Sequence, residues 1–177
     1  GNSAPSGGAA KLHLYTTGAS NAFEYNTVTG NISTDSDGAT IYLVDQGNPG
    51  TFAYNNIQNN TATYELYLYN SATDPNYGAR NNWWGTASDT EIQALIYDWN
   101  DGDPTRGILT YSPYLNSPNT AAPPSPPENV AAQTGLTTIA LAWDASPEAD
   151  ITGYKVHYDT DAAGYPYANS TNVGNVT

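Results

Sequence analysis

Apolar and polar residues alternate along three short segments in the first half of the chain. The segments are Lys11–Tyr15, Thr40–Val44 and Glu65–Tyr69. A period of two is typical of a β-strand with one buried face. We therefore expect three strands, and their predicted inward positions are Leu12, Leu14, Ile41, Leu43, Leu66 and Leu68.

A second set of segments aligns without gaps and indicates an internal repeat. Residues 21–28, 50–57 and 77–84 align at steps of 29 and 27 residues. The alignment places Phe23 with Phe52 and Ala79, Asn26 with Asn55 and Asn82, and Val28 with Ile57 and Trp84. Recurrence at this period predicts a stack of similar two-strand units whose equivalent strands pair in parallel.

The aligned asparagines predict a hydrogen-bonded ladder. An amide side chain carries both a donor and an acceptor, so identical asparagines on successive repeats can bond to one another. The alternative is that asparagine is simply common in turns. The register over three repeats favours the ladder.

The period breaks after Trp84, where the pattern changes to that of a helix. Ser88 and Glu91 have the spacing of a capping box. Apolar residues then follow at helical spacing, namely Ile92, Leu95, Ile96 and Trp99. We expect a short amphipathic helix that covers the last repeat, with residues 107–111 as a closing strand.

Residues 81–86, 91–98 and 107–115 together resemble the C-terminal end of secreted right-handed parallel β-helix repeat proteins. The resemblance spans about residues 11–118, and its most specific element is Asn-Asn-Trp-Trp-Gly at 81–85. It implies an all-β fold of about three coils with a capping helix. Some relatives are polysaccharide lyases or glycoside hydrolases and others are surface or adhesive proteins, usually with many more coils.

The second half of the chain has a different pattern. Residues 1–10 look like a linker, residues 11–115 hold the repeats and cap, residues 116–127 form a proline-rich linker, and residues 128–177 form a second module. In that module, residues 137–144 and 151–159 alternate as strands. They resemble the first half of a fibronectin type III domain, in which Trp143 matches the core tryptophan.

A complete sandwich of that kind needs about seven strands, so this module is expected to be incomplete. An incomplete sandwich leaves apolar strand faces uncovered. Three explanations are open: a longer natural chain, a truncation, or a neighbouring chain that donates the missing strands.

Charge and composition narrow the class of protein. Seventeen acidic residues against four basic ones give a net charge of −13, which works against binding to nucleic acid or an anionic membrane surface. The chain has no cysteine, and no apolar stretch is long enough to span a membrane. An acidic chain rich in tyrosine and asparagine is typical of an exported protein, so we expect a secreted or cell-surface location.

No catalytic residue is assigned. The carboxylates available to a lyase or glycosidase are Glu24, Asp35, Asp37, Asp45 and Glu65, and Arg80 is the basic residue of the later repeats. Glu24 and Arg80 hold equivalent positions two repeats apart, about 10 Å at the usual strand spacing. They are therefore interpreted as solvated surface residues rather than an ion pair.

No cofactor is assigned either, although two acidic turns have the oxygen-rich character that suits Ca²⁺. One contains Asp98, Asn100, Asp101 and Asp103, and the other contains Asp35 and Asp37. Neither follows the EF-hand pattern, and polar turns that end elements are the alternative. His13 and His157 are solitary, which argues against zinc.

Outward tyrosines provide the candidate contact surface. Tyr15, Tyr42, Tyr67 and Tyr69 alternate with the inward leucines. Such a face can bury against protein or stack on sugar rings, or it can simply reflect the β-propensity of tyrosine. Sequons for glycosylation occur at Asn31, Asn59, Asn169 and Asn175.

The sequence thus favours an extracellular structural or adhesive scaffold, a subunit or segment of a surface assembly or fibre completed by contacts between chains. The expected partners are other copies or the remainder of its own chain, with polysaccharide as a further candidate and no nucleic acid or membrane insertion. The alternative is a non-catalytic C-terminal fragment of a carbohydrate-active enzyme whose active site lies upstream.

Overall fold

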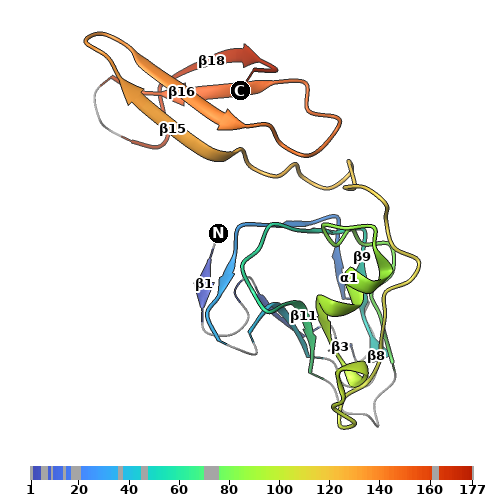
Figure 1. Cartoon of the computed structure of the whole chain (residues 1–177). Helices are drawn as coiled ribbons and strands as arrows, with labels where there is room; N and C mark the ends of the chain where they lie inside the picture. Colours follow the sequence, from blue (N-terminus) through green and yellow to red (C-terminus); the bar gives the residue numbers. More distant parts are fainter. Residues whose placement is uncertain are drawn as a thin grey trace. The chain divides into compact units, whose positions relative to one another are not determined.

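In the described part of the chain the regular structure is mostly β-strand, with one α-helix and one 3-10 helix (Figure 1). The computed structural model describes residues 2–4, 8, 10–13, 15–16, 21–35, 38–44, 48–69, 76–160 and 164–176. The chain divides into two compact units, Gly1–Pro123 and Pro124–Thr177.

The main sheet of the first unit contains the strands that the alternating pattern predicts. It consists of β2 (Ala10–His13), β7 (Ala39–Val44), β11 (Tyr64–Leu68) and β13 (Ile96–Tyr97), in the order β13-β11-β7-β2. All neighbouring strands in it are parallel. The predicted inward residues Ile41, Leu43, Leu66 and Leu68 are fully buried and Leu12 is partly buried, whereas Leu14 lies outside the described residues.

The aligned segments of the repeat also lie side by side in parallel. Strand β4 (Ala22–Glu24) pairs with β9 (Thr51–Ala53), and β5 (Thr27–Val28) pairs with β10 (Asn56–Ile57). Phe23 is directly opposite Phe52, and their rings stack at 5.4 Å. Trp84 stacks on the other side of Phe52 at 6.5 Å and is buried, as expected for a packing tryptophan.

Two minor pairs complete the repeats. Strand β1 (Ser3–Ala4) is parallel to β6 (Ile32–Ser33), whereas β3 (Tyr15–Thr16) is antiparallel to β8 (Asn48–Pro49). Within the described part of the first unit, the pair of β3 and β8 is therefore the exception to parallel pairing.

The helix forms where its cap predicts it, but it is shorter than its apolar pattern indicates. Helix α1 (Asp89–Ala94) begins after Ser88, whose side chain accepts a hydrogen bond from the Glu91 amide. The prediction that Ile96 and Trp99 share the helical face is wrong. Ile96 belongs to β13, and Trp99 begins a 3-10 helix (Trp99–Asp101). The Trp99 side chain is 48% exposed.

Strand pairing explains why the helix stops early. The carbonyl of Leu95 accepts hydrogen bonds from the amides of Glu65 and Leu66, so the chain rejoins the main sheet at that point. Ile96 then lies opposite Leu66 in the sheet. Its side chain is fully buried as part of a strand and not as part of a helix.

The pairing register also continues beyond the third aligned segment. Strand β12 (Tyr77–Gly78) pairs in parallel with β14 (Leu109–Thr110), which confirms the closing strand predicted at residues 107–111. Because β13 pairs with β11 and β14 pairs with β12, the parallel pairing continues past helix α1. Ile92 of the helix and Leu109 of β14 join the buried core.

Part of the proline-rich segment packs on the first unit. The Asn119 amide N–H donates to the side-chain oxygen of Asn56 at 2.6 Å, and the Asn119 side chain donates to the Tyr54 carbonyl at 2.6 Å. Ala122 is buried as well. Residues 119–122 of the predicted linker therefore belong to the first unit.

The second unit consists of two antiparallel hairpin-like pairs. Strand β15 (Glu128–Thr134) pairs with β16 (Ile139–Asp144), and β17 (Tyr154–Tyr158) pairs with β18 (Asn169–Gly174). Strands β16 and β17 fall within the two segments predicted from alternation. Trp143 and Tyr154 make an edge-to-face contact at 5.4 Å between the two pairs.

Candidate functional site

Three tyrosines form a stack across the outer side of the main sheet. Tyr42 of β7 lies opposite Tyr67 of β11, which lies opposite Tyr97 of β13. Their ring centroids are 4.8 and 4.4 Å apart, and the rings are within 10° and 15° of parallel. The predicted grouping of Tyr42 with Tyr67 is present, and sequence reasoning missed Tyr97 because it assigned that segment to a helix.

A cation adjoins this stack. The guanidinium carbon of Arg106 lies 4.4 Å from the Tyr69 ring centroid and 5.6 Å from that of Tyr67, within cation–π range. Its Nε donates to the Asp103 carboxylate at 3.1 Å. Burial acts to lower the pKa of Arg106, but the neighbouring Tyr67 and Asp103 raise it overall. We call Tyr42, Tyr67, Tyr69, Tyr97 and Arg106 the tyrosine face.

Stacking determines which parts of the tyrosine rings stay accessible on the tyrosine face. Because Tyr42, Tyr67 and Tyr97 stack on one another, they present ring edges and hydroxyls outward rather than open ring faces. Sugar stacking needs an open face, whereas protein interfaces use edges and hydroxyls readily. Tyr69 is the most exposed of the face, at 49%.

Tyr15, the fourth residue of the predicted surface, lies elsewhere in the strand order. It belongs to β3, which pairs with β8 and not with the main sheet. On β2, the residue directly opposite Tyr42 is instead Lys11. The side chain of Tyr15 lies outside what the structure describes.

The hydrogen bonds confirm the predicted asparagine ladder. The backbone amide and side-chain nitrogen of Asn26 donate to the side-chain oxygen of Asn55 at 2.9 and 3.1 Å. The same two groups of Asn55 donate to Asn82 at 2.9 and 3.0 Å. Asn55 and Asn82 are fully buried, so these bonds satisfy amides that would otherwise be costly to bury.

A second ladder was not predicted. The Asn31 backbone amide and side-chain nitrogen donate to the Asn60 side-chain oxygen at 2.9 and 3.0 Å, and the Asn2 amide donates to Asn31 at 3.0 Å. Asn60 in turn donates to the Glu65 carboxylate at 3.0 Å. The sequence did contain a signal, because Asn31 and Asn60 are separated by the same 29 residues as Asn26 and Asn55.

Five of the ladder asparagines follow a residue with left-handed backbone, namely Asn26, Asn31, Asn55, Asn60 and Asn82. Tyr25, Tyr54 and Asn81 have φ of 55°, 59° and 59° before the first ladder, and Gly30 and Asn59 have φ of 66° and 55° before the second. Such conformations are unfavourable for residues with a side chain, above all for tyrosine. We call these left-handed positions the corners of the chain. The ladder bonds and contacts such as the Tyr25–Tyr54 ring stack at 5.1 Å hold the corners in place.

The structure separates the sequence candidates for catalysis. The Nε of Arg80 donates to the Ser112 carbonyl at 2.8 Å. Glu24 is on β4, where it lies opposite Ala53 of β9. Glu65 is committed to the second ladder. Asp35 is exposed, and Asp37 and Asp45 lie outside the described residues.

The acidic turn around Asp98 acts as a structural cap. The buried Asp98 carboxylate accepts hydrogen bonds from the amides of Asn100 and Leu109, both at 2.8 Å. Asp101 accepts from the Asp98 amide at 2.9 Å, which completes a capping box. In the described ranges, no group of three or more histidine, aspartate or glutamate residues is arranged to hold a metal ion.

A groove beside α1 brings together two carboxylates that sequence reasoning did not associate. It has a volume of about 440 Å³ and is lined by Gln58, Asn59, Glu65, Trp84, Gly85, Thr86, Glu91, Ala94 and Leu95. Burial raises the pKa of Glu65, although the hydrogen bond from Asn60 and the nearby Thr40 hydroxyl oppose this. Glu91 accepts a hydrogen bond from the Thr86 hydroxyl.

The four sequons differ in accessibility. Asn31 is 6% exposed, and its side-chain nitrogen donates to the Thr29 carbonyl and to Asn60. Asn59, Asn169 and Asn175 are exposed. The nitrogen that a glycan would occupy is therefore engaged at Asn31.

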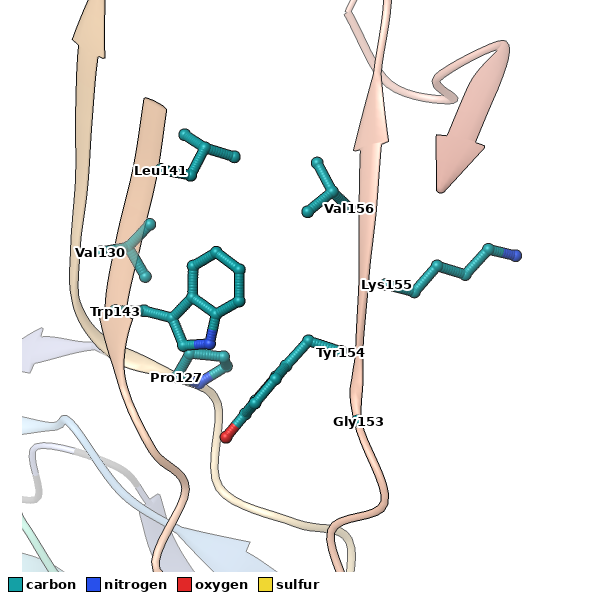
Figure 2. Close-up of a pocket in the computed structure, with 8 residues that line it drawn as sticks. All are labelled: Pro127, Val130, Leu141, Trp143, Gly153, Tyr154, Lys155 and Val156. Atoms are coloured by element: carbon teal, nitrogen blue, oxygen red, sulfur yellow. The ribbon is translucent and has the colours of Figure 1, made fainter. Parts of the chain in front are cut away.

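The second unit contains an open apolar groove of about 390 Å³ (Figure 2). Figure 2 shows Val130, Leu141 and Trp143 facing Tyr154 and Val156 across it, while Lys155 points away. Val130 and Leu141 are 64% and 41% exposed. Inner-face aliphatic residues of this kind are buried in complete sandwiches, so this face is an exposed apolar patch.

Comparisons with protein-family models, curated proteins and solved structures found no match for this chain. Within the residues that the structure describes, no helix is both long enough and apolar enough to cross a membrane.

Proposed function

We propose that the chain is an extracellular structural or adhesive scaffold whose first unit is a set of coils of a right-handed parallel β-helix. The parallel registers of β2, β7, β11 and β13 support the coil architecture. The observation that carries the proposal is the pair of asparagine ladders, because they commit the buried polar side chains of successive coils to holding the coils together.

The proposed assembly is completed by contacts between chains. The exposed inner face of the second unit supports this, since Val130, Ile139 and Leu141 are aliphatic residues of 41–66% exposure. Removing such apolar surface from water is favourable by about 25 cal/mol per Å², and association offsets part of this gain through lost translational and rotational freedom. The tyrosine face is a second surface of suitable chemistry. The acidic composition and the lack of cysteine are consistent with export.

The second candidate is a fragment of a carbohydrate-active enzyme. The groove beside α1 favours it, because Glu65, Glu91 and Trp84 line one cavity. Glycosidases place two carboxylates around the scissile bond and use aromatic rings to hold sugars. The carboxyl groups here are engaged with Asn60 and Thr86, which supports the scaffold reading over this one.

Sedimentation velocity and electron microscopy of the chain test the scaffold proposal. We expect oligomers or fibres that dissociate in the double variant Ile139→Thr, Leu141→Thr. Leu136→Thr is the matched control, because Leu136 is fully exposed but does not line the groove. A chain that stays monomeric at all concentrations contradicts the proposal, and cleavage of polyuronate or pectin by a longer protein that contains this chain favours the enzyme.

A further inference from the structure

Two sets of tyrosine rings are held in parallel contact between successive repeats. Tyr42, Tyr67 and Tyr97 form one set, with centroid distances of 4.8 and 4.4 Å. Tyr25 and Tyr54 form the other, at 5.1 Å and within 10° of parallel. The first set is fixed by strand pairing and the second by left-handed corners beside the first ladder. The backbone of the folded chain therefore keeps the rings of each set in contact.

We propose that these two stacks are sites of oxidative tyrosine cross-linking, which joins successive repeats by covalent bonds. The chain has fifteen tyrosines and no cysteine, so disulfides cannot supply such links. Each phenol loses one electron and one proton to become a phenoxyl radical. Two neighbouring radicals then form a bond between ring carbons ortho to their oxygens, and the displaced ortho hydrogens move to the oxygens to restore both phenols.

The oxidant is hydrogen peroxide acting through a haem peroxidase. It accepts the two electrons and two protons and leaves as two molecules of water, so the linked pair has lost two hydrogen atoms. Tyr69 is the exposed entry point to the first stack, with its ring 6.3 Å from that of Tyr67. A radical formed on Tyr69 can take an electron from Tyr67 and so pass into the stack. In the second stack Tyr25 and Tyr54 are themselves exposed.

The other tyrosine ring contacts among the described residues are not parallel. Tyr165 and Tyr167 are 6.2 Å apart and nearly perpendicular, and Tyr111 and Tyr114 are 6.2 Å apart and tilted by 34°. Tyr165 is 88% exposed. If exposure alone decided reactivity, Tyr165 would be the favoured site, whereas the geometry points to the two stacks. This contrast makes the proposal testable.

The test treats the dilute chain with hydrogen peroxide and a haem peroxidase, and measures dityrosine fluorescence and linked peptides by mass spectrometry. We expect links between residues 42 and 67, 67 and 97, and 25 and 54, each with the mass of two hydrogens lost. Tyr67→Phe keeps a stacking ring but cannot form a phenoxyl radical, so it abolishes the first two links. Tyr54→Phe abolishes the third, and Tyr165→Phe is the matched control that leaves all three.

Two results overturn the proposal. One is that Tyr67→Phe and Tyr54→Phe leave dityrosine fluorescence unchanged while Tyr165→Phe lowers it. The other is that the links join different molecules, seen as covalent dimers whose yield rises with protein concentration. Circular dichroism of each variant before oxidation shows whether the fold is retained, and Tyr69→Phe then tests the entry route separately by slowing the first stack alone.

Discussion

The side chain of Asn60 donates a 3.0 Å hydrogen bond to the carboxylate of Glu65, so the second ladder ends on a buried acid. A buried carboxylate is costly unless hydrogen bonds compensate it. Here burial raises the pKa of Glu65 above its ordinary value of 4.5, and the bond from Asn60 and the nearby Thr40 hydroxyl only partly offset that effect. The last rung of the ladder is therefore sensitive to pH.

The first prediction concerns this sensitivity. Because its pKa is raised on folding, Glu65 binds a proton more tightly in the folded chain than in the unfolded chain. Its contribution to stability is complete below the unfolded pKa of 4.5 and is lost as pH rises through the higher folded value. Glu65→Gln removes this loss, so the unfolding free energy of the variant relative to the native chain rises as pH increases from 4.5 through the higher folded pKa of Glu65.

Chemical denaturation across this pH range provides the measurement. Glu24→Gln is the matched carboxylate-to-amide control, since Glu24 is on β4 and outside the ladder. A difference between Glu65→Gln and the native chain that is the same at every pH contradicts the prediction.

The second prediction concerns the first ladder. Asn55→Ala removes the acceptor for Asn26 and the donor to Asn82 and to the Phe23 carbonyl, all in a buried site. We expect it to lower the free energy of unfolding by about 2–4 kcal/mol, because buried partners are left unsatisfied. Thr51→Ala, exposed in the same repeat, is the control. A loss no larger than that of the control in urea denaturation would show that the ladder is dispensable.

The first ladder was predictable because residue identity recurs along it, while the second was not. Asn26, Asn55 and Asn82 are the same residue at nearly constant spacing. The second ladder begins at Asn2, inside a segment that reads as a linker, and ends at Glu65, a different residue type. Because the second ladder ends on a different residue type, only the pair Asn31 and Asn60 shows a regular spacing in the sequence.

The tyrosine face was predictable only in part, because some of its residues are placed by local alternation and others by long-range contacts. Tyr42 and Tyr67 alternate with buried leucines, so their outward direction follows from a period of two. Tyr97 lies in a stretch whose apolar spacing also fits a helix, and only pairing with β11 decides between them. Arg106 reaches Tyr67 from 39 residues away, a contact that no local pattern encodes.

The third prediction concerns Arg106. Burial, Tyr67 and Asp103 raise the pKa of Tyr97, whereas the positive charge of Arg106 lowers it. Arg106→Gln removes that charge, so the Tyr97 hydroxyl should ionise at higher pH than in the native chain. Ultraviolet absorbance of tyrosinate during alkaline titration follows this, with Tyr97→Phe identifying the component. Arg80→Gln is the control, because Arg80 bonds to Ser112 instead. An unchanged titration of Tyr97 would contradict the effect.

The fourth prediction concerns modification of the sequons. A glycan on Asn31 would replace hydrogens that the side-chain nitrogen uses to reach Thr29 and Asn60, in a site that is 6% exposed. Expression in a host that glycosylates Asn-X-Ser/Thr sites should therefore leave Asn31 unmodified in the folded protein, while Asn59 is open to modification.

Peptide mapping of site occupancy gives the measurement, and Asn59→Gln should abolish the mass shift at that site alone. Because glycosylation can act on a chain before it folds, a modified Asn31 is expected only in molecules that fail to form the second ladder. Such molecules should be less resistant to proteolysis. Occupancy of Asn31 in fully protease-resistant protein would show that the second ladder tolerates the loss of a rung.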